Sequence, residues 1–498
     1  MSIAKLLLLI SLFFTSCKTS QSIARAKDER FTKELTTLKD FFHIPGLSVL
    51  VKQGDNLVYE KYLGLAKTDP NTGMDSNTTV PLASLTKIFS SILTLQLVEE
   101  KALDLNDPVS MYVNDPDIWD SIKIKHVLSH TSQGALGEHF YYSSRYSWLT
   151  RVIEKASGKS FKELINEKII RPLRMDNTYL LEDSLQLKTQ KRKLAGPYVY
   201  QGVTKKGFID YGYSSAAGIV STVRDLAKLS DALDKNLLIS NESKEMMFKP
   251  SEKDLPYGYG IFRQNLSGHK LLWGYGQYDC YSSLFLKVPD SRLTFIITAN
   301  NNLASDPPRL IYGNVAYSLF AVSFLKHFVL DLASAPLFEN ENSLSSLGTR
   351  INTSNSEFYL KKLLAQALSE SFMGVYHAEN AARSRSILRT VFRQYPDYAT
   401  YGDLPLLHNL TNLRYWAKKD STGIIGEFDT QIEAIGNNLL QKDSNNPYAN
   451  SYLGTYYNAK GDKLMAAKHF RAITNAKNFS KNWYTVQAEQ WLKQQSGN

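Results

Sequence analysis

The sequence predicts an α+β fold followed by an all-helical region, and three observations indicate this. Short apolar runs rich in β-branched residues occur both early and late in the first part of the chain, as expected for strands. Helical periodicity fills the stretch between them. From about residue 340 onward, strand patterns become rare and helical periodicity dominates. Early and late strands around a helical middle predict one domain whose two ends meet in a single sheet.

The expected strands are bounded by turn residues. Gly54-Asp55 separates the early pair and Pro289-Asp290-Ser291 separates the late pair. The four runs are residues 47–51, 56–62, 281–288 and 293–299. Helices are expected where apolar residues recur every three or four positions, and the clearest are residues 84–101, 146–156 and 161–170. The last two are separated at Ser157-Gly158.

Composition indicates a globular protein with a substantial core. Of the 498 residues, 43% are hydrophobic and 21% are charged, which excludes wholesale disorder, collagen-like sequence and coiled coil. The two cysteines exclude a disulfide framework, a multi-cysteine zinc site and an iron–sulfur cluster. The net charge of +10 is spread over the whole chain, and the basic run at residues 188–193 is typical of a solvated loop. No nucleic-acid partner is therefore expected.

The first 16 residues predict an export signal, because a basic start and a short apolar run precede Thr15-Ser16-Cys17. This ending resembles the lipobox of bacterial lipoproteins. The resemblance implies that Cys17 is acylated, that the signal is removed and that residues 17–30 form a tether. An ordinary secretory signal with an incidental cysteine is the alternative. A lipid anchor would hold the protein at a membrane of the cell envelope, and Lys18 in place of Asp favours the outer membrane, facing the periplasm.

Residues 340–498 are expected to form a separate helical domain. Within this region Gly454, Tyr457, Ala466 and Phe470 fall at the spacing of a tetratricopeptide helix pair. In such a pair, small residues let two helices approach while aromatic rings fill the groove. Arrays of this type usually contain three or more units, and a plain helical bundle is the alternative. A tail of this kind suits the recruitment of a protein partner.

Ser84 and Lys87 are the strongest candidates for chemistry. Pro81 precedes the expected helix, so Ser84 falls in its first turn and Lys87 shares its face. A lysine in apolar surroundings loses basicity and can take the proton of a serine, which makes the serine a nucleophile. The same serine-to-lysine spacing recurs at Ser2, Ser267 and Ser323. Only Ser84 follows a hairpin and a proline and opens a long helix.

In this context the sequence resembles the penicillin-binding-protein-like serine hydrolases, which include class C β-lactamases, D-aminopeptidases and related esterases. The motifs that carry the resemblance are residues 44–49 (IPGLSV), 83–87 (ASLTK), 103–109 (LDLNDPV), 124–132 (IKHVLSHTS), 140–144 (FYYSS), 172–175 (PLRM) and 217–222 (AGIVST). The resemblance covers the domain expected at residues 31–332. It implies a β-lactamase/transpeptidase-like antiparallel sheet with helices, and an acyl-enzyme on Ser84 with Lys87 as the general base.

A tyrosine and an asparagine two residues later form the second motif of this family. The matching residues are Tyr142 and Ser144. Tyr142 keeps the phenol that the resemblance implies for proton transfer, whereas Ser144 replaces the amide as the expected substrate contact. Counting back from Tyr146 would instead select Tyr141 and its neighbour Ser143, and the asparagine is missing in either register.

The third family motif, a His or Lys two residues before a Gly on a strand, falls on residues 273–277 (WGYGQ). Gly274 takes the position of the cation, unless a shift of one residue makes Tyr275 the substitute. Gly276 would let the strand approach closely, and the backbone N–H of Gln277 would complete the oxyanion hole with that of Ser84. Loss of the cation that binds a substrate carboxylate argues against β-lactams and D-peptides and favours esters, or amides without a carboxylate.

No metal and no other cofactor is expected. His126 and His130 flank Leu128-Ser129, and the family places this stretch in a structural turn beside the site. HExxH, a glycine-rich phosphate loop and a clustered carboxylate pair are all missing from the sequence. Cys280 is left as a lone thiol beside the third motif.

Two functions remain. The first is a serine hydrolase of the cell envelope, an esterase or peptidase rather than a true β-lactamase, acting on a small ester or peptide-like substrate. The second is a catalytically lapsed binding protein whose helical tail recruits a protein partner. Retention of Ser84, Lys87 and Tyr142 favours the enzyme, while Ser144 and Gly274 favour the binding protein.

Overall fold

A computed structural model of the protein describes residues 26–115, 118–189, 193–249, 254–352, 354–420 and 424–496. The predicted export signal and the predicted lipidation site, Cys17, lie outside these residues and stay predictions. A helix spans residues 26–41, so the described part of the expected tether is helical. Within the described ranges, no helix combines the length and the apolar character needed to cross a membrane.

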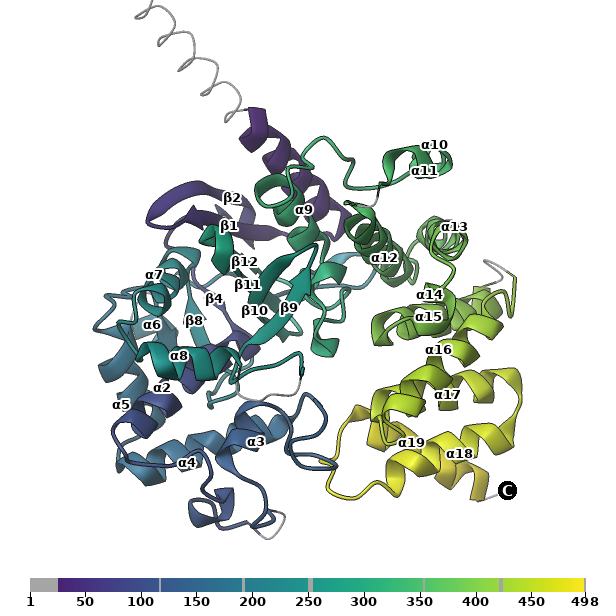
Figure 1. The fold of residues 1–498 in the computed structure, drawn as a ribbon. Coiled ribbons are helices and arrows are strands. Elements are labelled where there is room, and N and C mark those ends of the chain that lie inside the picture. The colour runs from purple at the N-terminus through teal and green to yellow at the C-terminus, as the bar shows by residue number, and fades with distance from the viewer. Residues whose placement is uncertain are drawn as a thin grey trace, which may run out of the picture.

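Seven antiparallel strands form the central sheet in the order β3-β2-β1-β12-β11-β10-β9 (Figure 1). Their bounds are β1 Gly46–Gln53, β2 Asn56–Thr68, β3 Asn71–Gly73, β9 Phe262–Leu266, β10 His269–Tyr278, β11 Tyr281–Val288 and β12 Leu293–Ala299. The early strand β1 pairs directly with the late strand β12, with Leu47 opposite Ala299. The α+β fold class is therefore confirmed, and the two ends of the first domain meet in one sheet as predicted.

Short strands and helices surround this sheet. Five short strands form two further sheets, in the orders β4-β8-β5 and β6-β7, and β4 is the strand that precedes Ser84. Their bounds are β4 Val80–Pro81, β5 Tyr179–Leu180, β6 Tyr198–Tyr200, β7 Thr204–Lys206 and β8 Ile219–Ser221. The helices of this domain are α2 Thr86–Glu99, α3 Ile124–Leu128, α4 Trp148–Ser157, α5 Phe161–Ile165, α6 Ser184–Thr189, α7 Val223–Asp234, α8 Asn241–Phe248 and α9 Leu319–Phe328. Gly158 ends α4 with φ +71°, at the break that the sequence predicts.

The two faces of the sheet belong to two apolar clusters, because side chains alternate along each strand. On β12, Phe295 and Ile297 pack with the helix of residues 26–41 and with α9. Ile296, between them, joins the opposite cluster, which contains α2, α4 and α7. The sheet is thus the middle layer of a three-layer domain (Figure 1).

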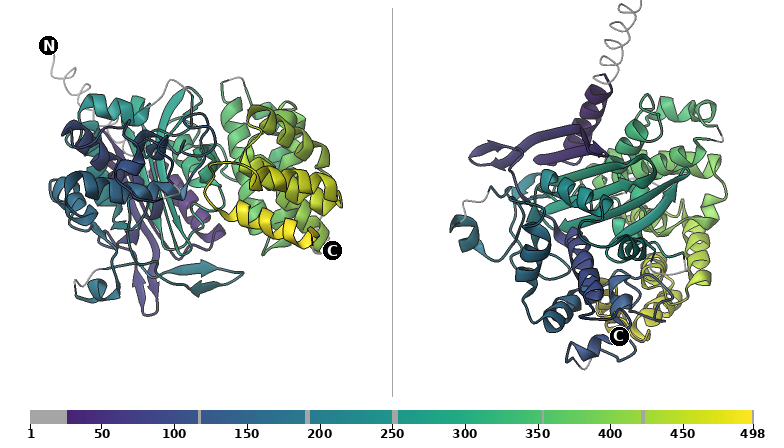
Figure 2. Two further views of the ribbon diagram at one scale, coloured as in Figure 1. Left: turned by 90° about the horizontal axis from the view of Figure 1, so that it is seen from below. Right: turned by 60° about the vertical axis from the view of Figure 1, so that its left-hand side comes forward.

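The second part of the chain is helical, as predicted, and forms a block beside the sheet-containing domain (Figure 2). Its helices are α10 Glu341–Ser345, α11 Leu347–Arg350, α12 Ser356–Met373, α13 Ala378–Gln394, α14 Tyr398–Tyr401, α15 Leu404–Asp420, α16 Asp429–Lys442, α17 Pro447–Lys460, α18 Lys463–Thr474 and α19 Trp483–Ser496. At Gly454 a Cβ would lie 2.8 Å from the Phe470 ring, so the glycine permits the close contact of α17 with α18. The assignment as a tetratricopeptide unit stays a prediction.

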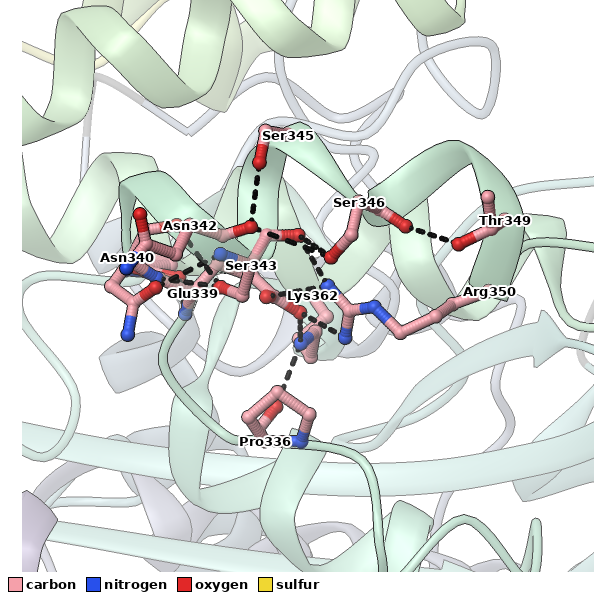
Figure 3. A network of polar contacts seen from close by, with 11 residues as sticks. Pro336, Glu339, Asn340, Asn342, Ser343, Ser345, Ser346, Thr349, Arg350 and Lys362 are labelled. Carbon is pink, nitrogen blue, oxygen red and sulfur yellow. Dashed lines mark hydrogen bonds and ion pairs between the residues drawn. The ribbon is translucent and has the colours of Figure 1, made fainter.

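A buried cluster of charges holds the segment that leads into the helical tail against α12 (Figure 3). The side chains of Glu339 and Lys362 are both 0% exposed and pair directly. Arg350 donates to the same carboxylate over 2.9 Å, and Lys362 Nζ also donates to the Pro336 carbonyl over 2.7 Å. Although burial opposes ionisation, the hydrogen bond from Arg350 and the charge of Lys362 lower the pKa of Glu339 to about 2. The apolar cluster of the sheet also continues into the helical tail, so one core joins both parts.

Candidate active site

Ser84 lies at the point where a strand turns into a helix. Strand β4 ends at Pro81, and a single 3₁₀ turn, Ala83–Leu85, leads into α2. Ala83 adopts φ +48°, a left-handed conformation that costs a non-glycine residue roughly 1 kcal/mol. This turn sets Ser84 at the start of the helix, as the sequence predicts, and directs it into a pocket rather than into the core.

Lys87 is held against Ser84. Its Nζ lies 2.9 Å from Ser84 Oγ and 3.1 Å from the Ala216 carbonyl oxygen. The rings of Tyr142 and Tyr146 cover the amine at 4.9 and 5.3 Å. Burial lowers the pKa of Lys87 from 10.5 to about 7. A large fraction of the lysine is therefore neutral near pH 7 and has a lone pair with which to accept the serine proton.

Tyr142 completes the group around Ser84. It lines the same pocket as Ser84, the two side chains interact, and burial raises the pKa of the phenol, so it stays protonated at neutral pH. Tyr141 points away, toward the helical tail, and donates to Asp443 Oδ2 over 2.5 Å. Of the two registers that the sequence leaves open, the structure brings Tyr142 to Ser84 and not Tyr141.

His130 supports the loop that carries Tyr142. Its ring stacks on the Tyr142 ring with centroids 4.3 Å apart, and its Nδ1 accepts the backbone N–H of Ser143 over 3.0 Å. Burial and the charge of Lys87 hold the pKa of His130 well below its usual range, so the ring is neutral. His126 Nδ1 accepts the N–H of Lys123 over 3.2 Å and caps α3. In the part of the chain that the structure describes, no group of three or more His, Cys, Asp or Glu side chains is placed to hold a metal ion.

Ser144 does not reach Ser84. Its exposed side chain lines a separate hollow together with Trp119, Trp148 and Lys481. The reason is local: Ser143 Oγ accepts the N–H of Arg145 over 3.1 Å and caps the next helical turn, which starts at Ser144 and turns it outward. The substrate contact expected at Ser144 is thus absent from the Ser84 pocket.

Strand β10 passes directly behind Ser84. A Cβ at Gly276 would lie 1.8 Å from the Leu82 carbonyl oxygen, so only glycine permits this approach. A Cβ at Gly274 would lie 2.9 Å from Ile88 Cδ1 and 3.0 Å from Leu85 Cδ1, which leaves no space there for a lysine or histidine. Tyr275 and Gln277 point to the other side, into the pocket that contains Ser84. Gln277 thus lies in the wall of this pocket, and the oxyanion role of its backbone N–H stays a prediction, while Tyr275 contributes a ring to the wall.

The pocket has a volume of about 660 Å³, within the usual range for small-molecule sites. The first domain contributes Ser84, Tyr142, Tyr275, Gln277, Asp306, Arg309, Leu310, Ile311 and Tyr312. The helical tail contributes His408, Thr411, Asn412, Tyr415, Tyr448, Ser451, Tyr452, Thr455, Trp483 and Gln487. About half of the lining therefore comes from a region that the sequence presents as a separate domain.

Arg309 is the one arginine or lysine that lines the pocket, and it lies outside the predicted motifs. Its guanidinium pairs with Asp306 over 2.8 Å, and its Nε donates to His408 Nε2 in the tail over 3.0 Å. The side chain is 30% exposed. The pocket thus has a cation, but on the loop after β12 and already paired, instead of on β10. No pattern around Arg309 could have indicated it, since its partner His408 is nearly 100 residues away.

Comparisons with known proteins match the first domain. A family model described as beta-lactamase matches residues 35–316. Penicillin-binding protein 4* of Bacillus subtilis (strain 168) is 24% identical over 327 residues, which cover 55% of this chain and 72% of that protein. Unguisins hydrolase ungD' of Aspergillus campestris (strain IBT 28561) is 25% identical over 341 residues, or 56% of this chain and 62% of that protein, less than two thirds of its length.

Among solved structures, the octameric penicillin-binding protein homologue from Pyrococcus abyssi is similar with a TM-score of 0.53 and 21% identity, over 68% of this chain and 81% of that chain. This likeness shows the fold.

Proposed function

Because the chain belongs to the beta-lactamase family, whose members are serine hydrolases, we propose that it hydrolyses an ester or amide through an acyl-enzyme on Ser84. The observation that carries this proposal is the contact of Ser84 with a lysine whose pKa burial lowers to about 7. Ordinary lysines are almost fully charged at pH 7 and cannot act as bases. A buried lysine kept close to neutrality, 2.9 Å from a serine hydroxyl, has the geometry and the basicity of a general base.

Ser84, Lys87 and Tyr142 share the proton transfers of acylation. Neutral Lys87 takes the hydroxyl proton as Ser84 Oγ attacks the carbonyl carbon, and a tetrahedral oxyanion forms beside the backbone N–H groups of Ser84 and Gln277. The bond from that carbon to the leaving oxygen or nitrogen then breaks. Tyr142, protonated because burial raises its pKa, gives its proton to the leaving group and regains one from the Lys87 ammonium. The products are the Ser84 ester and a free alcohol or amine.

Deacylation uses the same groups. A water molecule attacks the Ser84 ester and gives a proton to Lys87, and the second tetrahedral intermediate collapses. The proton returns to Ser84 Oγ as the bond to the acyl carbon breaks, which releases a carboxylic acid and restores the free serine.

Two features of the pocket favour a substrate without a carboxylate. Gly274 is packed against Ile88 and Leu85, so β10 offers no cation to this pocket. Arg309 is paired with Asp306, which compensates its charge. An ester, or an amide without a carboxylate, suits this pocket better than a β-lactam. The predicted lipid anchor at Cys17 would place this activity in the cell envelope.

The test is covalent labelling of Ser84. The purified protein is incubated with an alkyl fluorophosphonate and, separately, with a penicillin, and the mass added to the Ser84 peptide is measured. We expect a fluorophosphonate adduct and no penicillin adduct. Ser84→Ala should abolish labelling, whereas the matched variant Ser267→Ala, at another serine with a lysine three residues later, should not change it. Absence of any adduct would favour the lapsed binding protein, and a stable penicillin adduct would contradict the substrate preference.

A further inference from the structure

The face of the helical tail that lines the pocket has a regular construction. Tyr448, Ser451, Tyr452 and Thr455 lie on α17 at successive spacings of three, one and three, which is a single helix face. The same spacing on α15, from His408 to Tyr415, supplies four more lining residues. Two helices thus turn one complete stripe each toward Ser84. A stripe of this kind normally packs against another helix, yet here both stripes line a cavity.

The side chains of this face carry no formal charge. None of the tail residues that line the pocket is an acid, a lysine or an arginine. Burial keeps the phenols of Tyr448 and Tyr452 protonated, because it raises their pKa. The hydroxyls and amides hydrogen-bond with one another, as Ser451 donates to Gln487 over 2.7 Å and Gln487 donates to Thr455 over 3.1 Å. Rings with interspersed neutral polar groups suit an uncharged substrate group that contains a ring.

The Tyr448 hydroxyl takes no part in this internal pairing. It is buried and finds no hydrogen-bond partner among the described residues. An unpaired buried hydroxyl costs free energy that a bound acceptor would recover. Tyr448 lines the same pocket as Ser84, Tyr142 and Tyr275. Its hydroxyl therefore keeps an unused hydrogen-bond donor at the wall of the pocket that contains Ser84.

The tail is also fastened to the loop that carries Tyr142. Asn478 donates from its amide to the Gly134 carbonyl over 3.1 Å, and the N–H of Ser480 donates to Gln133 Oε1 over 2.7 Å. Tyr141, next to Tyr142 in the chain, reaches Asp443 of the tail. The wall and the Tyr142 loop thus form one hydrogen-bonded unit, and the tail holds a fixed position opposite Ser84.

We propose that the helical tail is the substrate-selecting half of the active site: the α15–α17–α19 face binds an uncharged, ring-bearing group next to the scissile bond, and the Tyr448 hydroxyl donates a hydrogen bond to it. The inference rests on the proposed function, since it takes Ser84 as the reacting group. It gives the tail a role within this chain, in place of the protein recruitment that the sequence suggests.

A binding experiment tests this inference independently of catalysis. The Ser84→Ala protein is titrated calorimetrically with phenylacetamide, with acetamide and with phenylacetate, which separate the effect of the ring from that of charge. We expect phenylacetamide to bind at least about 10-fold more tightly than either of the others. Tyr448→Phe in the same background should weaken phenylacetamide binding about 3- to 10-fold, the effect of one lost hydrogen bond.

The matched control is Tyr484→Phe. Tyr484 is a buried tail tyrosine whose ring lies 5.5 Å from that of Tyr448, but it does not line the pocket, so the same change there should leave binding unaltered. Equal affinities for phenylacetamide and acetamide, tighter binding of phenylacetate, or equal effects of the two tyrosine variants would each overturn the inference. Failure of fluorophosphonate to label Ser84 would instead overturn the proposed function and leave the binding result to stand on its own.

Discussion

The strongest consequence of the site geometry is a pH dependence set by Lys87. If the neutral amine is the base and its pKa is about 7, about 10% of the molecules carry it at pH 6 and about 90% at pH 8. The second-order rate constant for labelling of Ser84 by fluorophosphonate should therefore rise about tenfold between these pH values and become constant above pH 8. A lysine with the ordinary pKa of 10.5 would give a rise of about 100-fold over the same interval and no plateau.

The measurement is the labelling rate from pH 5.5 to 9.5 at constant ionic strength. Tyr142 is not expected to titrate in this range, because burial raises its pKa. Lys87→Met should remove the labelling at every pH, and the free energy of unfolding of this variant separates loss of the base from loss of the fold. A rate that keeps rising tenfold per pH unit beyond pH 9 would refute the assignment of Lys87 as a buried base.

The same pKa difference makes Lys87 a cost to stability. The folded protein binds fewer protons at Lys87 than the unfolded chain between about pH 7 and 10.5, so stability should rise with pH across this window and be lowest below it. At pH 7 the lowered pKa of Lys87 reduces the free energy of unfolding by at most about 4 kcal/mol. Lys87→Met should accordingly raise the free energy of unfolding at pH 7. The gain is reduced by the loss of the hydrogen bonds to Ser84 and Ala216. A variant that is inactive and also less stable at pH 7 would contradict this reasoning.

Two further predictions concern packing. Gly276→Ala should lower the melting temperature and abolish Ser84 labelling, because the new Cβ would meet the Leu82 carbonyl oxygen and force β10 away from the turn before Ser84, at a cost of about 3 kcal/mol. The control is Gly73→Ala, where a Cβ would meet nothing within 4 Å. Normal labelling of Gly276→Ala would contradict the close approach of β10 to this turn. Glu339→Gln should destabilise the protein by about 3–5 kcal/mol in urea unfolding, since it leaves Lys362 buried without its counter-charge. The pKa of Glu339 lies below its ordinary value of 4.5, so the contribution of this carboxylate to stability is present above pH 4.5 and is lost as the pH falls toward 2. An unchanged urea midpoint in Glu339→Gln would refute this prediction.

The parts of the fold that depend on local sequence could be predicted closely. Strands β11 and β12 begin and end at the predicted residues, because each is a continuous apolar run bounded by turn residues. The contact of Ser84 with Lys87 was likewise accessible, since residues three apart on a helical turn share a face whatever surrounds them. In both cases the relevant interactions lie within a few residues of one another.

Features decided by distant parts of the chain could not be predicted. Family position selected Ser144 as a substrate contact, but the cap formed by Ser143 turns it into a different hollow. Arg309 enters the pocket because Asp306 and His408 hold it, and His408 belongs to α15 of the tail. A single sequence gives no information on such pairs, because either residue alone is compatible with an ordinary exposed loop or a helix surface.

The tail stripes show where the sequence carried a signal that periodicity alone does not reveal. The spacing of Tyr448, Tyr452 and Thr455 is that of a face packed against another helix. Its composition differs from such a face, since Ser451 and Thr455 place hydroxyls where a helix interface would favour apolar side chains. Buried hydroxyls are costly unless they are paired, and here Gln487 of α19 pairs both. A helical stripe with the spacing of a packing face and the polarity of a surface therefore indicates a cavity wall, but the sequence does not say which part of the chain lies opposite it.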